Sequence, residues 1–173
     1  DIDFKYDKSD FILKNFNLEI DSGQLIGIVG ATGSGKTTIV KLLLRFYDSV
    51  SGSLFIGGKD IKDLSIKDLR RNIGFVSQES FLFDGSIKEN ICYSHNKFDE
   101  KMMERSAKIA QAHEFIDQMP LKYDTQIGER GQILSVGQKQ RLSIARAIYK
   151  DPSIFIFDEA TSSVDNLTEK HIQ

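Results

Sequence analysis

Residues 30–37 combine glycines, a lysine and a threonine at a spacing that suits phosphate binding. They read Gly-Ala-Thr-Gly-Ser-Gly-Lys-Thr, which fits the phosphate-loop pattern G-x-x-x-x-G-K-[ST]. The glycines let backbone N–H groups turn inward around phosphate oxygens, and the N-terminus of a following helix adds positive charge. Lys36 should reach the β- and γ-phosphates, and the Thr37 hydroxyl should bind Mg²⁺. The predicted nucleotide-binding residues of this loop are Gly30, Thr32, Gly33, Ser34, Gly35, Lys36, Thr37 and Thr38.

An acidic pair follows a second apolar segment. Residues 154–157, Ile-Phe-Ile-Phe, predict a buried strand that ends in Asp158 and Glu159. Ligands of open α/β sheets bind at the carboxyl ends of the strands. Asp158 is therefore expected to hold Mg²⁺, and Glu159 to act as general base on the attacking water. The alternative for both is a solvated acidic turn.

A third motif predicts a second helix end suited to phosphate. Residues 134–138, Leu-Ser-Val-Gly-Gln, stand directly before a long helical pattern. Ser135 should cap this helix, Gly137 permits close approach of the backbone, and the helix dipole favours an anion. The alternative is an ordinary capped helix.

The surrounding pattern predicts the elements that hold these motifs. Leu25–Val29 is a continuous apolar run, typical of a strand covered on both faces. Ser65 with Asp68, and Ser86 with Glu89, have the spacing of helix caps. Further strands are expected at residues 2–6, 16–20, 53–56 and 73–77, and helices at 37–46, 99–112, 113–119 and 135–149.

The predicted fold class is α/β. It consists of a P-loop NTPase core with a mixed sheet and flanking helices, an antiparallel β start and an inserted α-helical subdomain. The expected ATP-binding core covers residues 1–85 and 153–173, and the helical subdomain covers residues 86–152.

Composition narrows the class of protein. The chain has 173 residues, 40% of them hydrophobic, and a net charge of −2. That balance argues against a nucleic-acid-binding protein, which usually has a basic excess. The single cysteine, Cys92, is expected to be a small buried side chain and favours a reducing, cytosolic setting. No apolar run approaches the roughly 20 residues of a membrane span. If the protein acts at a membrane, we expect this domain to do so from the aqueous side.

Taken together, the three motifs resemble those of ABC transporter ATP-binding domains. Residues 134–138 are similar to the ABC signature, with Val136 where the family usually has glycine. The resemblance implies that Ser135, Gly137 and Gln138 contact the γ-phosphate held by another subunit's phosphate loop.

Further matches extend over almost the whole chain. Tyr6 stands where the family stacks an aromatic ring on adenine, although it could instead be a strand residue facing the core. Gln78 resembles the Q-loop glutamine that contacts Mg²⁺ and water, with an exposed loop residue as the alternative. Residues 163–165 look like the D-loop at the dimer interface, or else a capping turn. The resemblance thus assigns catalytic roles to Lys36, Gln78 and Glu159.

Two stretches resemble exporters in particular. Residues 81–91 are similar to the exporter segment after the Q-loop, and residues 125–131 to the exporter X-loop, which touches the membrane domain. The alternative for Glu129 and Arg130 in the X-loop is a solvated ion pair.

The resemblance implies an ATPase whose two copies, identical or different, close around two MgATP and drive transmembrane export. Its expected partners are a second nucleotide-binding domain and a transmembrane domain contacted through the Q-loop and X-loop, at the cytoplasmic face of a membrane. A soluble ABC ATPase acting in DNA repair or translation is the first alternative. A P-loop kinase is the second, although it leaves residues 134–138 unexplained.

The family's switch histidine is expected beyond Gln173. His95, His113 and His171 are interpreted as surface residues. The sequence is therefore expected to be a fragment that alone binds nucleotide weakly and hydrolyses ATP slowly or not at all.

Overall fold

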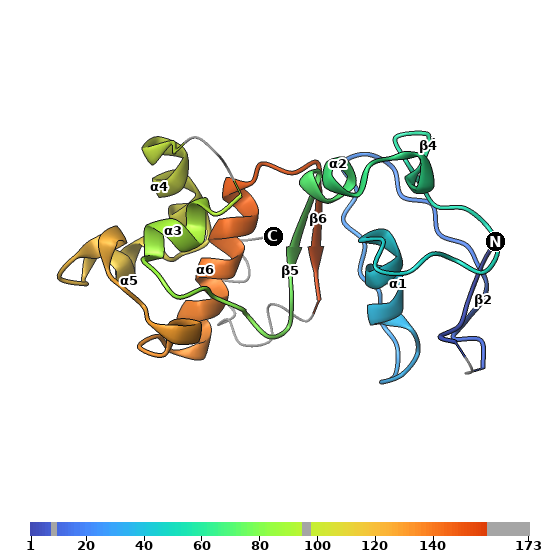
Figure 1. Cartoon of the computed structure of the whole chain (residues 1–173), viewed down its shortest axis with the longest axis horizontal. Helices are drawn as coiled ribbons and strands as arrows, with labels where there is room; N and C mark the ends of the chain where they lie inside the picture. Colours follow the sequence, from blue (N-terminus) through green and yellow to red (C-terminus); the bar gives the residue numbers. More distant parts are fainter. Residues whose placement is uncertain (8–9, 95–97, 159–173) are drawn as a thin grey trace. The chain divides into compact units, whose positions relative to one another are not determined.

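The computed structural model of the chain describes residues 1–7, 10–94 and 98–158. It divides into two compact units, the first covering Asp1–Arg70 and the second beginning at Arg71. Each unit has its own hydrophobic core. Figure 1 shows the strands and helices that make up each of them.

The first unit is built on a short antiparallel strand pair. β1 (Ile2–Phe4) pairs with β2 (Leu13–Phe16), and Ile2 lies opposite Phe16. α1 (Lys36–Leu43) follows the predicted phosphate loop. The apolar alternation of β1 and the apolar side of α1 meet in one core, whose buried members are Ile2, Phe4, Leu13, Ile39 and Leu42.

A hairpin and a short helix complete the first unit. β3 (Phe55–Ile56) and β4 (Lys59–Asp60) pair across Gly57 and Gly58, which have φ angles of 56° and 76°. Glycine adopts such angles at little cost, which permits this tight turn between the two strands. The 3₁₀ turn Ile61–Asp63 leads to α2 (Ile66–Arg71).

The predicted cap of α2 is also present. The backbone N–H of Asp68 donates to Ser65 Oγ at 3.0 Å, and Ser65 Oγ donates to Asp68 Oδ2 at 2.6 Å. The serine thereby satisfies one of the N–H groups that a helix leaves free in its first turn.

The predicted strand Leu25–Val29 is wrong. The segment has no strand structure, and Leu25 and Val29 are 83% and 93% exposed. A strand is stabilised through hydrogen bonds to neighbouring strands. The described strands of this unit pair as β1–β2 and β3–β4, and neither pair includes this segment. An apolar run indicates side chains that favour burial. Whether the segment forms a strand depends on a neighbouring strand with which its backbone can form hydrogen bonds.

The second unit contains a parallel strand pair. β5 (Ile73–Val76) pairs with β6 (Ile154–Phe157), with Ile73 opposite Ile154. Burial of all four β6 residues was expected, and this is wrong, because Phe155 and Phe157 are 45% and 40% exposed. Successive side chains of a strand point to opposite faces. Phe155 and Phe157 therefore share one face of β6, and the described residues do not cover that face.

Helices form most of the second unit. They are α3 (Ile87–Cys92), α4 (Glu100–Ile109), α5 (His113–Asp117) and α6 (Val136–Tyr149), with 3₁₀ turns at Lys122–Asp124 and Glu129–Gly131. α6 contacts α3, α4 and β5. Figure 1 shows α6 between the β5–β6 pair and these two helices. α6 is therefore the central element of this unit.

The predicted helices are found. α1, α4 and α5 end earlier than expected, and α6 ends at Tyr149 as predicted. α4 stops at Ile109 rather than Ala112 because Gln111 takes a positive φ of 53°, which a right-handed helix cannot continue through. Ser86 and Glu89 form the predicted capping box at α3.

The single cysteine was expected to be a small buried side chain. Cys92 is half-buried against the core of the second unit. In the ranges that the structure describes, none of the helices combines the length and the apolar character that crossing a bilayer requires.

β5 and β6, assigned from the sequence to the ATP-binding core, share a unit with the helices of residues 86–152. The subdomain boundaries stay a prediction.

Candidate functional site

The phosphate loop is shaped by two left-handed glycines. Gly33 and Gly35 have φ angles of 84° and 96°, and the N–H of Ser34 donates to the carbonyl of Ala31 at 3.1 Å. A side chain at Gly35 would place its Cβ 3.0 Å from Leu13 Cδ2. Glycine is required at Gly35 both for the backbone angle and for the close approach of the core.

The N-terminus of α1 opens directly from this loop. Gly35 is the N-cap residue and supplies no side-chain hydrogen bond to the first turn. The first N–H groups of a helix have no partner within the helix, and they carry partial positive charge. This end of α1 therefore keeps its donors for an anion.

Lys36 lies over the loop that precedes it. Its Nζ donates to the carbonyls of Gly30 and Ala31 at 2.8 Å and 3.0 Å. These bonds hold the ammonium group against the start of the loop. The arrangement concentrates positive charge where the sequence predicts the β- and γ-phosphates.

The two threonines after Lys36 point to different surroundings. Thr37 is exposed, so its hydroxyl is accessible to a metal ion or a phosphate. Thr38 is only 6% exposed, and its Oγ1 shares a 3.3 Å hydrogen bond with Tyr6 Oη. A phosphate contact from Thr38 would therefore come from its backbone N–H.

Tyr6 belongs to an aromatic cluster of the first unit. Its ring lies edge-on to Phe4 and Tyr47, with centroids 4.9 Å and 5.0 Å apart, and the ammonium group of Lys41 lies 5.5 Å from its centroid. The ring is half-buried. This packing favours the alternative of a structural aromatic residue, and adenine stacking by Tyr6 stays a prediction.

The signature segment forms a capped helix end in the second unit. The N–H of Gln138 donates to Ser135 Oγ at 3.3 Å, and the N–H of Ser135 donates to Gln138 Oε1 at 2.9 Å. Leu134 is buried and anchors the segment, while Val136 is 70% exposed. The predicted cap is confirmed, and the end of α6 is presented to solvent.

The predicted metal and water ligands lie in two units. Thr37 belongs to the first unit, and Asp158 and Gln78 to the second. Asp158 follows β6, and its N–H donates to the carbonyl of Val76 at 3.0 Å, so it stands at the carboxyl end of the parallel pair. Gln78 is exposed just beyond β5. Glu159, residues 163–165, His95 and His171 lie outside the described residues.

Residues 1–7, 10–94 and 98–158 contain no group of three histidine, cysteine or acidic side chains placed to hold a metal ion.

The two exporter-like stretches lie against each other. The N–H of Ile127 donates to the carbonyl of Gly85 at 2.9 Å, and the N–H of Ile87 donates to the carbonyl of Thr125 at 3.1 Å. Ile127 is fully buried. In the described structure Glu129 and Arg130 form no ion pair. The X-loop resemblance thus falls on a segment packed onto residues 81–91.

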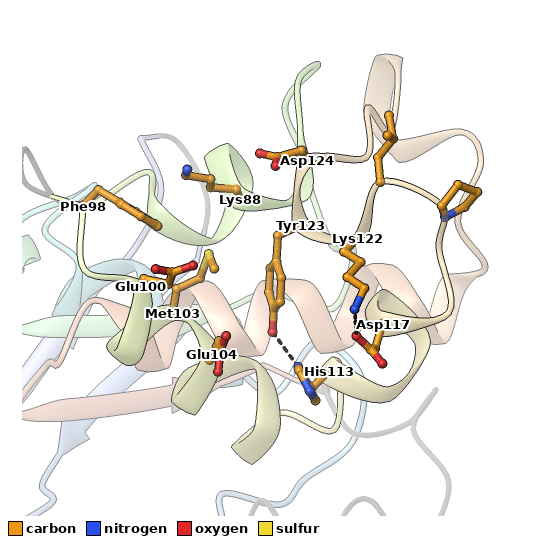
Figure 2. A pocket seen from close by; sticks show the side chains of 12 residues that line it. Lys88, Phe98, Glu100, Met103, Glu104, His113, Asp117, Lys122, Tyr123 and Asp124 are labelled. Atoms are coloured by element: carbon orange, nitrogen blue, oxygen red, sulfur yellow. Dashed lines mark hydrogen bonds and ion pairs between the residues drawn. The ribbon is translucent and has the colours of Figure 1, made fainter.

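A separate cavity of about 400 Å³ lies among the helices of the second unit. Figure 2 shows the Tyr123 hydroxyl pointing to His113, whose Nδ1 lies 2.9 Å from it. Burial, with the charges of Glu104 and Asp117, raises the pKa of Tyr123 to about 12. The lining contains more acidic side chains than lysines. The acidic residues are Glu100, Glu104, Asp117 and Asp124, and the lysines are Lys88 and Lys122. An acidic lining does not favour a triphosphate, so the nucleotide is not assigned to this cavity.

Asn90 and Arg146 were not singled out from the sequence, although the structure gives both several partners. Asn90 is 1% exposed on α3, and Arg146 on α6 donates to it at 2.7 Å. The signal was present: Asn90 shares the helical face of Ile87 and Ile91, where a polar residue needs a buried partner.

Known proteins match nearly the whole chain. The ABC transporter family model matches residues 13–162. An uncharacterized ABC transporter ATP-binding protein of Bacillus subtilis, YfiC, is 48% identical over 173 residues, which is 100% of this chain and 29% of that protein. An ATP-dependent lipid A-core flippase of Syntrophus aciditrophicus is 46% identical over 172 residues, covering 99% of this chain and 28% of that protein.

A solved structure agrees in fold. The structure of a bacterial Atm1-family ABC exporter with ATP bound superimposes with a TM-score of 0.94 at 42% identity, covering 99% of this chain and 30% of that chain. The predicted fold class is thereby confirmed. The chain spans less than a third of the length of these relatives. It belongs to the ABC transporter family, and the part of the family that it matches is the ATP-binding domain of exporters.

Proposed function

We propose that this domain binds ATP with Mg²⁺, pairs with a second nucleotide-binding domain around two nucleotides, and hydrolyses them to drive transmembrane export. The observation that carries the proposal is the open N-terminus of α1, with Lys36 held over the phosphate loop by 2.8 Å and 3.0 Å hydrogen bonds. The relatives support it, since they include a flippase and an exporter with ATP bound.

Phosphate binding follows from the physics of this loop. Its glycines turn backbone N–H groups inward, and the first turn of α1 adds donors that no side chain occupies. Charge-assisted hydrogen bonds from Lys36 are about twice as strong as neutral ones. The loop therefore holds the triphosphate firmly while leaving its outer side accessible.

Hydrolysis requires an oriented water near the γ-phosphate. We assign Glu159 as the base that accepts a proton from that water, and Gln78 as the residue that orients it. Thr37 and Asp158 are the proposed Mg²⁺ ligands. Held by these residues, the ion would offset negative charge on the phosphates.

Pairing gives the signature segment its role. Ser135 and Gly137 stand at an exposed helix end in a unit different from the one that holds the phosphate loop. A partner's γ-phosphate placed at this end binds the N–H groups that the capping box leaves free. Hydrolysis and release of that phosphate remove the contact, so the pair opens.

The alternatives receive less support. A soluble ABC ATPase of DNA repair or translation would share these motifs, but the similar proteins described above are an ABC transporter ATP-binding protein, a flippase and an exporter. A P-loop kinase does not require an exposed capped helix at residues 134–138.

We also propose the partners and the location. The X-loop, residues 125–131, and Gln78 would contact a transmembrane domain at the cytoplasmic face of a membrane. Both lie on the second unit, which also carries the signature helix.

The test is nucleotide-dependent pairing. Ser135→Arg places a long cation at the exposed end of α6, where it obstructs the partner's nucleotide. We expect pairing with a non-hydrolysable ATP analogue, measured by light scattering, to fall at least about tenfold in affinity. Gln118→Arg is the matched control, because Gln118 is an exposed residue of the same unit at the end of α5. Equal pairing by the wild type and Ser135→Arg would exclude this role of the signature.

A further inference from the structure

The segment after the Q-loop is organised by the side chain of one buried asparagine. Asn90 Oδ1 accepts from the N–H of Phe83 at 2.9 Å, and Asn90 Nδ2 donates to the carbonyls of Phe83 and Ser86 at 3.0 Å each. The side chain thereby links the loop before α3 to the helix itself. All three bonds are within one stretch, Phe81–Ile91.

Arg146 joins this stretch to the middle of α6. Its Nη2 donates to Asn90 Oδ1 at 2.7 Å, its Nε donates to the Asn90 carbonyl at 2.8 Å, and its Nη1 donates to the Phe81 carbonyl at 2.8 Å. Only a guanidinium group presents donors in a planar fork that fits three acceptors at once. The contacts span 56 and 65 residues of sequence.

The guanidinium also supports a surface aromatic cluster. It lies 5.1 Å from the ring centroid of Phe83, and Phe83 stacks on Tyr93 with centroids 4.3 Å apart. Phe81 lies edge-on to Phe83 at 5.3 Å. Phe81 and Tyr93 are 56% and 66% exposed, so the cluster reaches the surface.

Among the described residues Arg146 forms no ion pair with a carboxylate, and burial lowers its pKa to about 10. The charge is therefore balanced by carbonyl dipoles and a ring. A buried charge held in this way is costly unless every donor is satisfied. Such a contact tolerates little relative movement of α6 and Phe81–Ile91.

We infer that Arg146 is a positioning residue that locks the segment Phe81–Ile91 to α6, so that the Ser135 end of α6 moves together with that segment. Ser135 and Arg146 lie on one helix, about 16 Å apart at 1.5 Å per residue. A displacement of the segment is carried along this rigid element to the phosphate-facing end. The inference rests on the proposed function, and it adds a regulatory link to the signature contact.

The test uses the intact transporter that contains this domain, reconstituted in lipid. Arg146→Lys keeps the charge but loses the fork. We expect kcat for ATP hydrolysis to fall by about tenfold with KM for ATP nearly unchanged, because the phosphate loop is untouched. Arg105→Lys is the control, since Arg105 is exposed on α4 of the same unit. A purely structural role would lower the unfolding temperature and the folded yield, with no selective effect on kcat.

A second measurement needs no variant. Amide hydrogen exchange of the wild-type transporter is compared with and without a non-hydrolysable ATP analogue. We expect residues 81–91 to gain protection in parallel with residues 135–138. A change at residues 135–138 with none at 81–91 would overturn the lock, as would Arg146→Lys with wild-type kcat. Failure of the proposed function is distinguishable, because the wild-type transporter would then show no ATP hydrolysis at all.

Discussion

Two helix N-termini in this domain carry the predicted chemistry, and they are built differently. α1 begins at Gly35, which provides no side-chain cap, and Lys36 folds back over the loop. α6 begins at Ser135, where the serine and Gln138 form a reciprocal capping box. The first helix end keeps its donors for a ligand, whereas the second satisfies part of its own.

The difference indicates two roles. An uncapped helix end preceded by left-handed glycines is costly for the folded chain unless an anion occupies it, so it suits the permanent phosphate site. A capped end is stable by itself, with Ser→Ala at such a position costing about 1 kcal/mol. It can remain formed while no phosphate is near, which suits a contact that is made and broken.

The largest expected effect comes from removing the positive charge of Lys36, which only the α1 end has. Lys36→Ala removes the ammonium group of the α1 end, and ATP affinity should fall by roughly 10- to 150-fold. Titration with a fluorescent ATP analogue measures this. Lys67→Ala, at an exposed position of α2, serves as control and should change nothing. Unchanged ATP affinity in Lys36→Ala would contradict the assignment of the α1 end as the phosphate site.

The second effect concerns the backbone of the α1 end. In Gly35→Ala the Cβ lies 3.0 Å from Leu13 Cδ2 at a φ of 96°, so the loop must shift. We expect a loss of about 1–2 kcal/mol in unfolding free energy and an affinity loss of about tenfold. Gly23→Ala shares the positive φ but has no heavy atom within 4 Å. Gly23→Ala should lower the free energy of unfolding without changing ATP affinity. An equal loss of affinity in Gly23→Ala would show that general backbone strain, and not the shape of the phosphate loop, lowers ATP affinity in Gly35→Ala.

The smallest effect concerns the α6 end. Val136 is 70% exposed beside the signature glycine, where its side chain adds bulk that glycine would not. Val136→Gly should strengthen nucleotide-dependent pairing roughly two- to fivefold, at a cost of a few tenths of a kcal/mol in helix stability. Val136→Ala should fall between the two. Weaker pairing in the glycine variant, measured by sedimentation, would mean that valine makes a favourable contact.

Local signals predicted these two helix ends well. Glycine, lysine and serine act through their own backbone angles and hydrogen bonds, so a short motif specifies α1 and the cap at Ser135. The segment Leu25–Val29 could not be predicted in this way, because a strand depends on partners distant in sequence. Arg146 likewise depends on acceptors 56 and 65 residues away, which helical periodicity can suggest but not identify.

Amide hydrogen exchange at both helix ends tests the central claim most directly. The domain is measured with a non-hydrolysable ATP analogue and Mg²⁺, at concentrations below and above pairing. We predict that residues 33–38 gain protection at both concentrations and residues 135–138 only when two copies pair. Protection of residues 135–138 in the single copy, or none at residues 33–38, would contradict the division of roles between the two ends.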